Sequence, residues 1–104
     1  MPSPADEPPP YRIEVAEEVW EALSRLPVGI QRKVTNFWRD HLRVTPHRPP
    51  IGGVHRLKGQ WRDFYQFDVD RQRRMMYRVD DETRTVFVDY LGNHPQWDKR
   101  NPFR

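Results

Sequence analysis

The sequence predicts a single α+β domain, in which a two-helix hairpin packs on one face of a small twisted antiparallel sheet in the order β-α-α-β-β-β. Three observations predict this fold. Hydrophobic residues recur at helical spacing between residues 15 and 42, and at alternate positions between residues 61 and 92. A connector rich in proline and glycine separates the two regions. At 104 residues the chain is long enough for one hydrophobic core and too short for two ordinary domains.

The N-terminal segment and the first strand differ sharply in composition. Residues 2–10 contain five prolines and no large apolar residue, which predicts a disordered or polyproline-like tail over residues 1–10. The stretch YRIEV then alternates and predicts a short strand with Tyr11, Ile13 and Val15 on one face. We therefore expect one domain over residues 11–97, followed by a C-terminal tail over residues 98–104.

Two amphipathic helices are expected next. After Ala16 the hydrophobic period becomes helical, and acidic residues gather near the start of the first helix, where the helix dipole favours them. Pro27 ends this helix or begins the next one. The apolar positions of the first helix are Val15, Val19, Leu23 and Leu26, and those of the second are Ile30, Val34, Phe37, Trp38, His41 and Leu42.

The second half of the chain reads as strands. Residues 45–53 hold three prolines and two glycines, so they form a connector that neither a helix nor a sheet enters easily. VHRLKG predicts a short strand, and WRDFYQFDV, RMMYRV and TVFVDYLG predict three more. The polar turns DRQR and DDET join the last three into an antiparallel meander. The helices are expected to cover one face of this sheet and to leave the other basic or open to solvent.

Several classes of protein are excluded by what the sequence lacks. It has no cysteine, which excludes disulfide scaffolds and thiolate zinc sites. We find no glycine-rich phosphate loop, no nucleophile elbow and no His-Glu-x-x-His motif, and the four histidines are scattered, so no cofactor or metal is expected. Neither a signal peptide nor a membrane span is apparent, and the cytoplasm is the expected location.

Positive charge is concentrated in the second half of the chain. The net charge is +3, and residues 1–50 contribute seven Lys/Arg and seven Asp/Glu, which leaves the whole excess to residues 51–104. Clustered arginine suits a polyanion such as RNA, or an acidic protein partner. On charge alone, a solvated basic surface fits equally well.

These basic residues fit one reaction, which is the cleavage of RNA by attack of its own 2′-OH on the adjacent phosphate. The reaction needs two proton-transfer groups and fixed cations, and the nucleophile belongs to the substrate. Arginine matches phosphate oxygens with a planar fork, and histidine can donate or accept a proton near neutral pH. Strand alternation places Arg74 and Arg78 on one face. The residues involved are Arg56, Lys58, Arg62, Arg73, Arg74, Arg78 and His94.

The stretches HRLKGQWRDFYQFDV and RRMMYRVDDETRTVFVDYLGNHPQW resemble the RelE/ParE superfamily of toxins from bacterial type II toxin–antitoxin operons. The shared features are a Leu-Lys-Gly before the sheet, an Arg followed by two apolar residues and a Tyr, an acidic turn, and a strand that ends in Gly-x-His. The resemblance covers residues 11–97. It implies a RelE-like mRNA interferase, a metal-independent endoribonuclease that enters the A site of the 30S ribosomal subunit, with a cognate antitoxin as its protein partner.

The resemblance also implies roles for individual residues. Arg74 would stabilise the phosphate and His94 would act as general acid. Lys58 and Arg56 would contact the phosphate or support proton transfer. Trp61 or Trp97 would stack on a splayed base. The expected catalytic residues are therefore Lys58, Arg74 and His94, and the expected RNA-binding residues are Arg56, Trp61, Arg62, Arg73, Arg78 and Trp97.

Alternative readings stay open at this point. No tyrosine follows Tyr90, so the general base is unassigned, with Asp68, Asp70 or a basic residue as candidates. His94 also fits a turn residue whose ring packs beside Pro95 or Trp97. Arg74 also fits an arginine that pairs with Asp68 or Asp70 across the hairpin, a contact that stabilises little when exposed. The alternative functions are a ParE-like gyrase inhibitor that acts by binding, and a non-toxic module that docks an acidic peptide.

Overall fold

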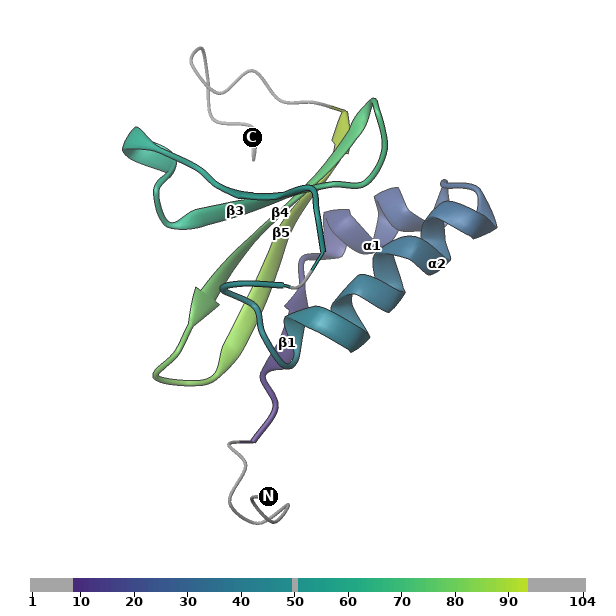
Figure 1. Ribbon diagram of the computed structural model, residues 1–104. Coiled ribbons are helices and arrows are strands. Elements are labelled where there is room, and N and C mark those ends of the chain that lie inside the picture. Colours follow the sequence, from purple (N-terminus) through teal and green to yellow (C-terminus); the bar gives the residue numbers. More distant parts are fainter. Residues whose placement is uncertain (1–8, 50, 94–104) are drawn as a thin grey trace.

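A five-stranded sheet carries two helices on one side (Figure 1). The computed structural model describes residues 9–49 and 51–93. Within these residues no helix combines the length and apolar character needed to cross a membrane. The elements are β1 (Arg12–Val15), α1 (Glu17–Ser24), α2 (Val28–Phe37), a π-helical turn (Trp38–Leu42), β2 (Val54–Arg56), a 3₁₀ turn (Gly59–Trp61), β3 (Phe64–Asp68), β4 (Arg73–Asp80) and β5 (Thr85–Asn93). The predicted α+β class is confirmed, and within the described residues four strands follow the two helices, counting the short strand that VHRLKG predicted.

The sheet has the strand order β1-β5-β4-β3-β2. Strands β2, β3, β4 and β5 pair with one another in antiparallel fashion, as the short turns between them require. Strand β1, however, runs parallel to β5, so the sheet is mixed and not wholly antiparallel as predicted. The reason is that no hairpin joins β1 to its neighbour: the chain leaves β1 through the helices and re-enters the sheet at the opposite edge.

The strand predicted over residues 61–69 begins later than its alternation suggests. Gly59 has φ +65°, a left-handed conformation that glycine adopts readily, and it opens the 3₁₀ turn that ends at Trp61. Strand β3 starts at Phe64. From Tyr65 onward the predicted alternation holds, because Tyr65 and Phe67 are both buried in the core.

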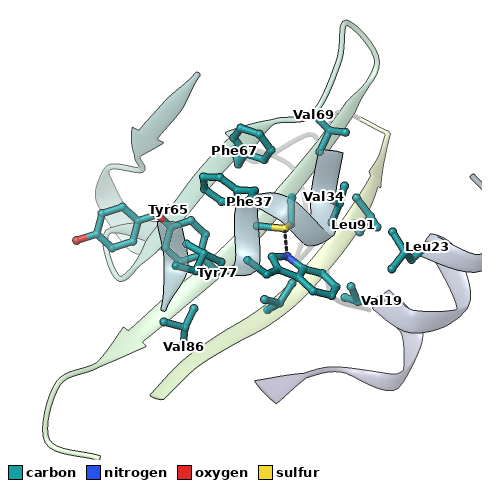
Figure 2. Close-up of a cluster of buried hydrophobic side chains, with 14 of the residues drawn as sticks. Val19, Leu23, Val34, Phe37, Tyr65, Phe67, Val69, Tyr77, Val86 and Leu91 are labelled. Carbon is teal, nitrogen blue, oxygen red and sulfur yellow. Dashed lines mark hydrogen bonds between the residues drawn. The ribbon is translucent and has the colours of Figure 1, made fainter. Parts of the chain in front are cut away.

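Aromatic stacking joins α2 to the middle of the sheet (Figure 2). Phe37 of α2 stacks on Phe67 of β3, with ring centroids 3.9 Å apart and an interplanar angle of 6°. Beside them Tyr65 stacks on Tyr77 of β4 at 5.1 Å. Burial of each large side chain contributes about 1.5–3 kcal/mol, so the Phe37–Phe67 contact stabilises α2 on the sheet and the Tyr65–Tyr77 contact stabilises the pairing of β3 with β4.

The hydroxyl of Tyr77 ties the proline-rich connector to β4. Tyr77 is fully buried, and its hydroxyl donates a hydrogen bond of 2.7 Å to the carbonyl oxygen of Pro46, which is also buried. Burial raises the pKa of the Tyr77 hydroxyl well above its ordinary value of 10.0, so the group stays protonated and remains a donor. The connector therefore has a fixed position where it leaves the second helix.

A bulge in β5 changes which residues face the helices. Met76 pairs with Tyr90 but Tyr77 pairs with Val88, which leaves Asp89 as an extra residue. Because of this insertion, Val88 and Leu91 both lie in the core although three positions separate them.

We predict that Tyr77→Phe lowers the free energy of unfolding by about 1–3 kcal/mol, because the buried Pro46 carbonyl loses its donor while the ring packing is kept. Chemical denaturation measures this. Tyr90→Phe is the matched control, since the Tyr90 hydroxyl bonds the Asn93 carbonyl in an exposed position, and its effect should be less than half as large. Equal stability of Tyr77→Phe and the wild type would contradict the anchoring role.

Candidate nucleic-acid interface

The sheet face opposite the helices carries side chains from β3 and β4 that strand alternation turns away from the core. We call it the helix-free face. The register pairs its members across the two strands, with Asp68 opposite Arg74 at one end and Phe64 opposite Arg78 at the other. Its members are Phe64, Gln66, Asp68, Arg74, Met76 and Arg78, of which Gln66 and Met76 in the middle are buried. The structure thus places Arg74 and Arg78 on one face.

Arg74 is held in one orientation at its end of this face. Its Nε lies 2.9 Å from Oδ1 of Asp68, an ion pair whose angle falls short of a hydrogen bond. Nη1 donates to the carbonyl oxygens of Asp70 and Arg73. The side chain is only 16% exposed, so it loses little conformational entropy when it binds a ligand.

Asp68 links a histidine to this arginine. Oδ2 of Asp68 lies 3.2 Å from Nε2 of His55, and Oδ1 accepts a hydrogen bond from the Gln66 side-chain amide. His55 is opposite Gln66 in the β2–β3 register, so it belongs to the same face. His55 has no signal in the sequence that marks it as a site residue, because only the strand register shows that it lies beside Asp68.

Asp70 and Arg73 form an ion pair with each other at the turn between β3 and β4. Arg73 Nη1 lies 2.6 Å from Oδ2 of Asp70, and Oδ1 of Asp70 accepts the backbone N–H groups of Gln72 and Arg73. Hydrogen bonding from the Arg73 backbone is the largest effect that lowers the pKa of Asp70. A carboxylate so well supplied with donors is a weak base, which makes Asp70 a poor choice for proton abstraction.

Aromatic rings surround the arginine at the other end. Arg78 Nε lies 2.6 Å from Oδ2 of Asp89, and its guanidinium lies 4.7 Å from the centroid of the Phe87 ring. The hydrogen bond to Asp89 raises the pKa of Arg78. Phe64 is opposite Arg78, and Trp61 packs edge-on against Phe64 at 5.8 Å. This end offers flat apolar surfaces next to a cation.

The remaining predicted basic residues do not gather around Arg74. Lys58 and Arg62 flank the 3₁₀ turn, are exposed, and lie near the Phe64 end of β3, about 13 Å along the strand from Asp68 at roughly 3.3 Å per residue. Arg56 lies on the helix side, because it pairs with Tyr65 and its guanidinium lies 5.5 Å from the Tyr65 ring centroid. The structure therefore divides the predicted set into two groups.

Two predicted residues, His94 and Trp97, lie outside the described residues. Strand β5 is described to Asn93, which pairs with Arg73, while Gly92 pairs with Arg74. A Cβ on Gly92 would lie 2.9 Å from the Tyr90 hydroxyl oxygen, so only glycine fits there without a shift. The described strand thus ends beside the two arginines. The role of His94 stays a prediction.

No three His, Asp or Glu side chains gather at a possible metal site within residues 9–49 and 51–93. What the helix-free face offers within these residues is fixed cations, a histidine oriented by a carboxylate, and aromatic rings at the far end. Such a surface can bind a phosphodiester and move a proton.

Known structures share this arrangement of elements. The toxin–antitoxin complex RelBE2 from Mycobacterium tuberculosis matches with a TM-score of 0.67 and 24% identity over 82% of this chain and 99% of that one. The archaeal RelE–RelB complex from Pyrococcus horikoshii matches with a TM-score of 0.67 and 26% identity over 80% and 93%. This chain has the fold of the RelE/ParE-type toxins. No protein-family model and no curated protein matches it.

A third RelE-like structure, the YoeB/ParE toxin from Agrobacterium tumefaciens, has a TM-score of 0.69 at 18% identity over 81% of this chain and 99% of that one. The described RelE-like fold therefore accounts for nearly all of that toxin's length. The resemblance first indicated by the Leu-Lys-Gly, Arg-x-x-Tyr and Gly-x-His motifs is confirmed as a shared fold.

We predict that Asp70→Asn destabilises the RelE-like domain in a pH-dependent way. The folded protein lowers the pKa of Asp70 below its ordinary 3.8, so the ionised carboxylate contributes stability above that pH and loses it as the pH falls through the lowered value. The difference in unfolding free energy between wild type and Asp70→Asn should be constant from pH 7 to 5 and shrink below about pH 4. Urea denaturation at each pH measures it, and a difference that persists unchanged to pH 2 would contradict this assignment.

Proposed function

We propose that this chain is the toxin of a toxin–antitoxin pair and that it cleaves mRNA on the ribosome. The observation that carries the proposal is Arg74, which is fixed on the helix-free face beside an aspartate and a histidine. The shared fold supports it, because the matching structures from Mycobacterium tuberculosis and Pyrococcus horikoshii are toxin–antitoxin complexes. The protein partner is then a cognate antitoxin, which we expect to cover the helical hairpin and the basic face.

Arg74 stabilises the charge that develops on the phosphate when the 2′-OH attacks. Its Nε and Nη1 face Asp68 and backbone carbonyls, and among the described residues Nη2 has no partner. Nη2 is thus the donor available to a phosphate oxygen. Because the guanidinium is already held in place, it stabilises the transition state without reorganising.

His55 is the best-placed general base among the described residues. Ionised Asp68 only accepts hydrogen bonds, so it selects the form of His55 that carries a hydrogen on Nε2. The lone pair on Nδ1 is then available to take the 2′-OH proton. His94 protonates the leaving 5′-oxygen in this scheme, as its position two residues after Gly92 suggests.

The far end of the face binds the RNA chain. Lys58 and Arg62 contact phosphates of neighbouring nucleotides, since they lie too far along β3 to share a phosphate with Arg74. Trp61 stacks on a base, and Trp97 is a second candidate for stacking. Arg73 and Arg78 remain engaged with Asp70 and Asp89 and add positive potential at the two ends.

Induced expression with mapping of message 5′ ends tests this proposal. We expect the wild type to produce cuts whose upstream fragments end in 2′,3′-cyclic phosphate. Arg74→Ala should reduce cutting about 10²–10³-fold, as loss of a fixed transition-state donor does. His55→Gln and His94→Ala should each reduce it about 10²-fold or more, as loss of a proton-transfer group does. Arg25→Ala, which removes an exposed arginine at the end of α1, is the matched control and should cut normally.

Circular dichroism and thermal melts of each purified variant show that it is folded. Toxicity that persists in folded Arg74→Ala with intact message and damaged DNA would overturn the proposal in favour of gyrase binding. Harmless overexpression of the wild type with intact message would overturn it in favour of a non-toxic binding module.

A further inference from the structure

Three segments far apart in the sequence meet at a hydrogen-bonded chain on the helix side of the sheet. Nδ1 of His47 lies 2.7 Å from the Tyr65 hydroxyl, and Nε2 of His47 lies 2.9 and 3.0 Å from the two carboxylate oxygens of Asp81. Tyr11, from a fourth segment just before β1, donates its hydroxyl hydrogen to the same carboxylate. His47 comes from the connector, Tyr65 from β3 and Asp81 from the β4–β5 turn.

A cavity of about 490 Å³ opens directly on this chain. Among the described residues, the polar side chains that line it are those of Arg48, Arg56, His47 and Tyr65, and each of them can donate a hydrogen bond. Ile51 and Val54 supply an apolar wall. The volume falls within the usual range for sites that bind small molecules.

An adjoining cavity of about 380 Å³ shares His47, Arg56 and Tyr65 with the first but is also lined by negatively charged side chains. Three carboxylates line it, those of Asp63, Asp80 and Asp81, together with Arg78. The carboxylates repel an anion from the second cavity, so a negatively charged group entering this region is directed to the first.

We propose that the first cavity binds the phosphate group of a small phosphate monoester, with a free mononucleotide as the ligand class that its size and apolar wall fit. Arg48 and Arg56 pair with the phosphate, and the base or sugar packs against Ile51 and Val54. Arg56 is partly positioned already, because its Nε donates to the Arg62 carbonyl and its guanidinium lies near the Tyr65 ring. Planar guanidinium groups match phosphate oxygens well.

The hydrogen-bonded chain couples this binding to the charge on His47. The hydrogen bond from Tyr11, the largest effect, and the one from His47 lower the pKa of Asp81, so this carboxylate is ionised and accepts the Nε2 hydrogen of His47. When His47 is neutral, Nδ1 must accept, and the Tyr65 hydroxyl hydrogen is used inside the chain. When His47 is charged, Nδ1 donates to the Tyr65 oxygen, which frees the hydroxyl hydrogen for the phosphate.

Other charged groups around His47 also affect the electrostatic potential at its ring. Arg48 and Arg56 face it from the first cavity, while Asp63, Asp80 and Arg78 face the second. Arg84 acts on Asp81 and lies 4.2 Å from the Tyr11 ring centroid. Protonation of His47 adds one positive charge and one donor to the first cavity, so anion binding should strengthen as the pH falls.

This site is independent of the proposed RNA cleavage. Arg56 and Tyr65 lie on the helix side, whereas His55, Asp68 and Arg74 lie on the helix-free face. A binding measurement therefore tests the cavity whether or not the chain cuts RNA.

Nuclear magnetic resonance titration of the full chain with adenosine monophosphate, inorganic phosphate and adenosine tests the site. We expect both phosphates to shift the resonances of His47, Arg48, Arg56 and Tyr65, and adenosine to shift them far less. Arg56→Gln should weaken nucleotide binding about tenfold or more, as loss of a charge-assisted hydrogen bond does. Tyr65→Phe should weaken it by a smaller factor, because one neutral donor is lost. Arg25→Gln, with the same charge change on an exposed arginine of another element, should leave it unchanged.

The proposal is overturned if adenosine binds as well as adenosine monophosphate, or if Arg56→Gln and Arg25→Gln weaken binding equally. The second outcome would show attraction to the overall charge of the protein. It is also overturned if neither phosphate shifts these resonances, which would leave the hydrogen-bonded chain as a contact that only joins the connector to the turn.

A separate titration tests the coupling with inorganic sulfate, whose charge does not change between pH 5.5 and 8, unlike that of a phosphate monoester with a second pKa of about 6. We expect sulfate to bind more tightly at pH 5.5 than at pH 8, because a positively charged imidazole adds one charge and one donor to the cavity. The ratio of the two affinities should fall toward one in His47→Gln. An undiminished ratio in that variant would contradict the role of His47.

Discussion

The rest of the structure depends on the buried hydrogen bond from Tyr77 to the Pro46 carbonyl. The ring of the same tyrosine stacks on Tyr65. The hydrogen bond fixes the connector against β4, and the next residue, His47, then reaches Tyr65. Strand β4 also contributes to the opposite face. Because side chains alternate along a strand, Arg74 and Arg78 point away from the core while Tyr77 points into it. One strand therefore positions both the proposed RNA-cleaving face and the proposed phosphate cavity.

Aspartates determine what the arginines of the helix-free face can do. Asp68 pairs with Arg74 and Asp89 pairs with Arg78, so the positive potential of this face is smaller than its arginine content suggests. Their more important effect is orientation: Asp68 fixes Arg74 and His55 relative to each other, and a fixed guanidinium and imidazole are what phosphodiester cleavage requires.

Local patterns in the sequence predicted the helices, the strands of the meander and the face shared by Arg74 and Arg78, because periodicity reports which side of an element is buried. Pairing between distant segments was not predictable in this way. His55 meets Asp68 through the β2–β3 register, and His47 meets Asp81 across 34 positions, so neither contact has a local signature. The separation of Lys58 from Arg74 had the same origin, since the Gly59 turn delays the start of β3. The parallel pairing of β1 depends on the path of the helices and leaves no mark on YRIEV.

The central claim is that the substrate's own 2′-OH is the nucleophile, with Arg74 holding the phosphate that it attacks. Purified chain incubated with ribosomes programmed with a defined message tests this most directly, when that message is compared with one carrying a single 2′-deoxynucleotide on the 5′ side of the mapped cut. The account predicts that the all-ribose message is cut and that the deoxy-substituted message is bound but left intact at that position. Cutting of both messages at the same bond would contradict it, because the attacking group would then come from water or from the protein.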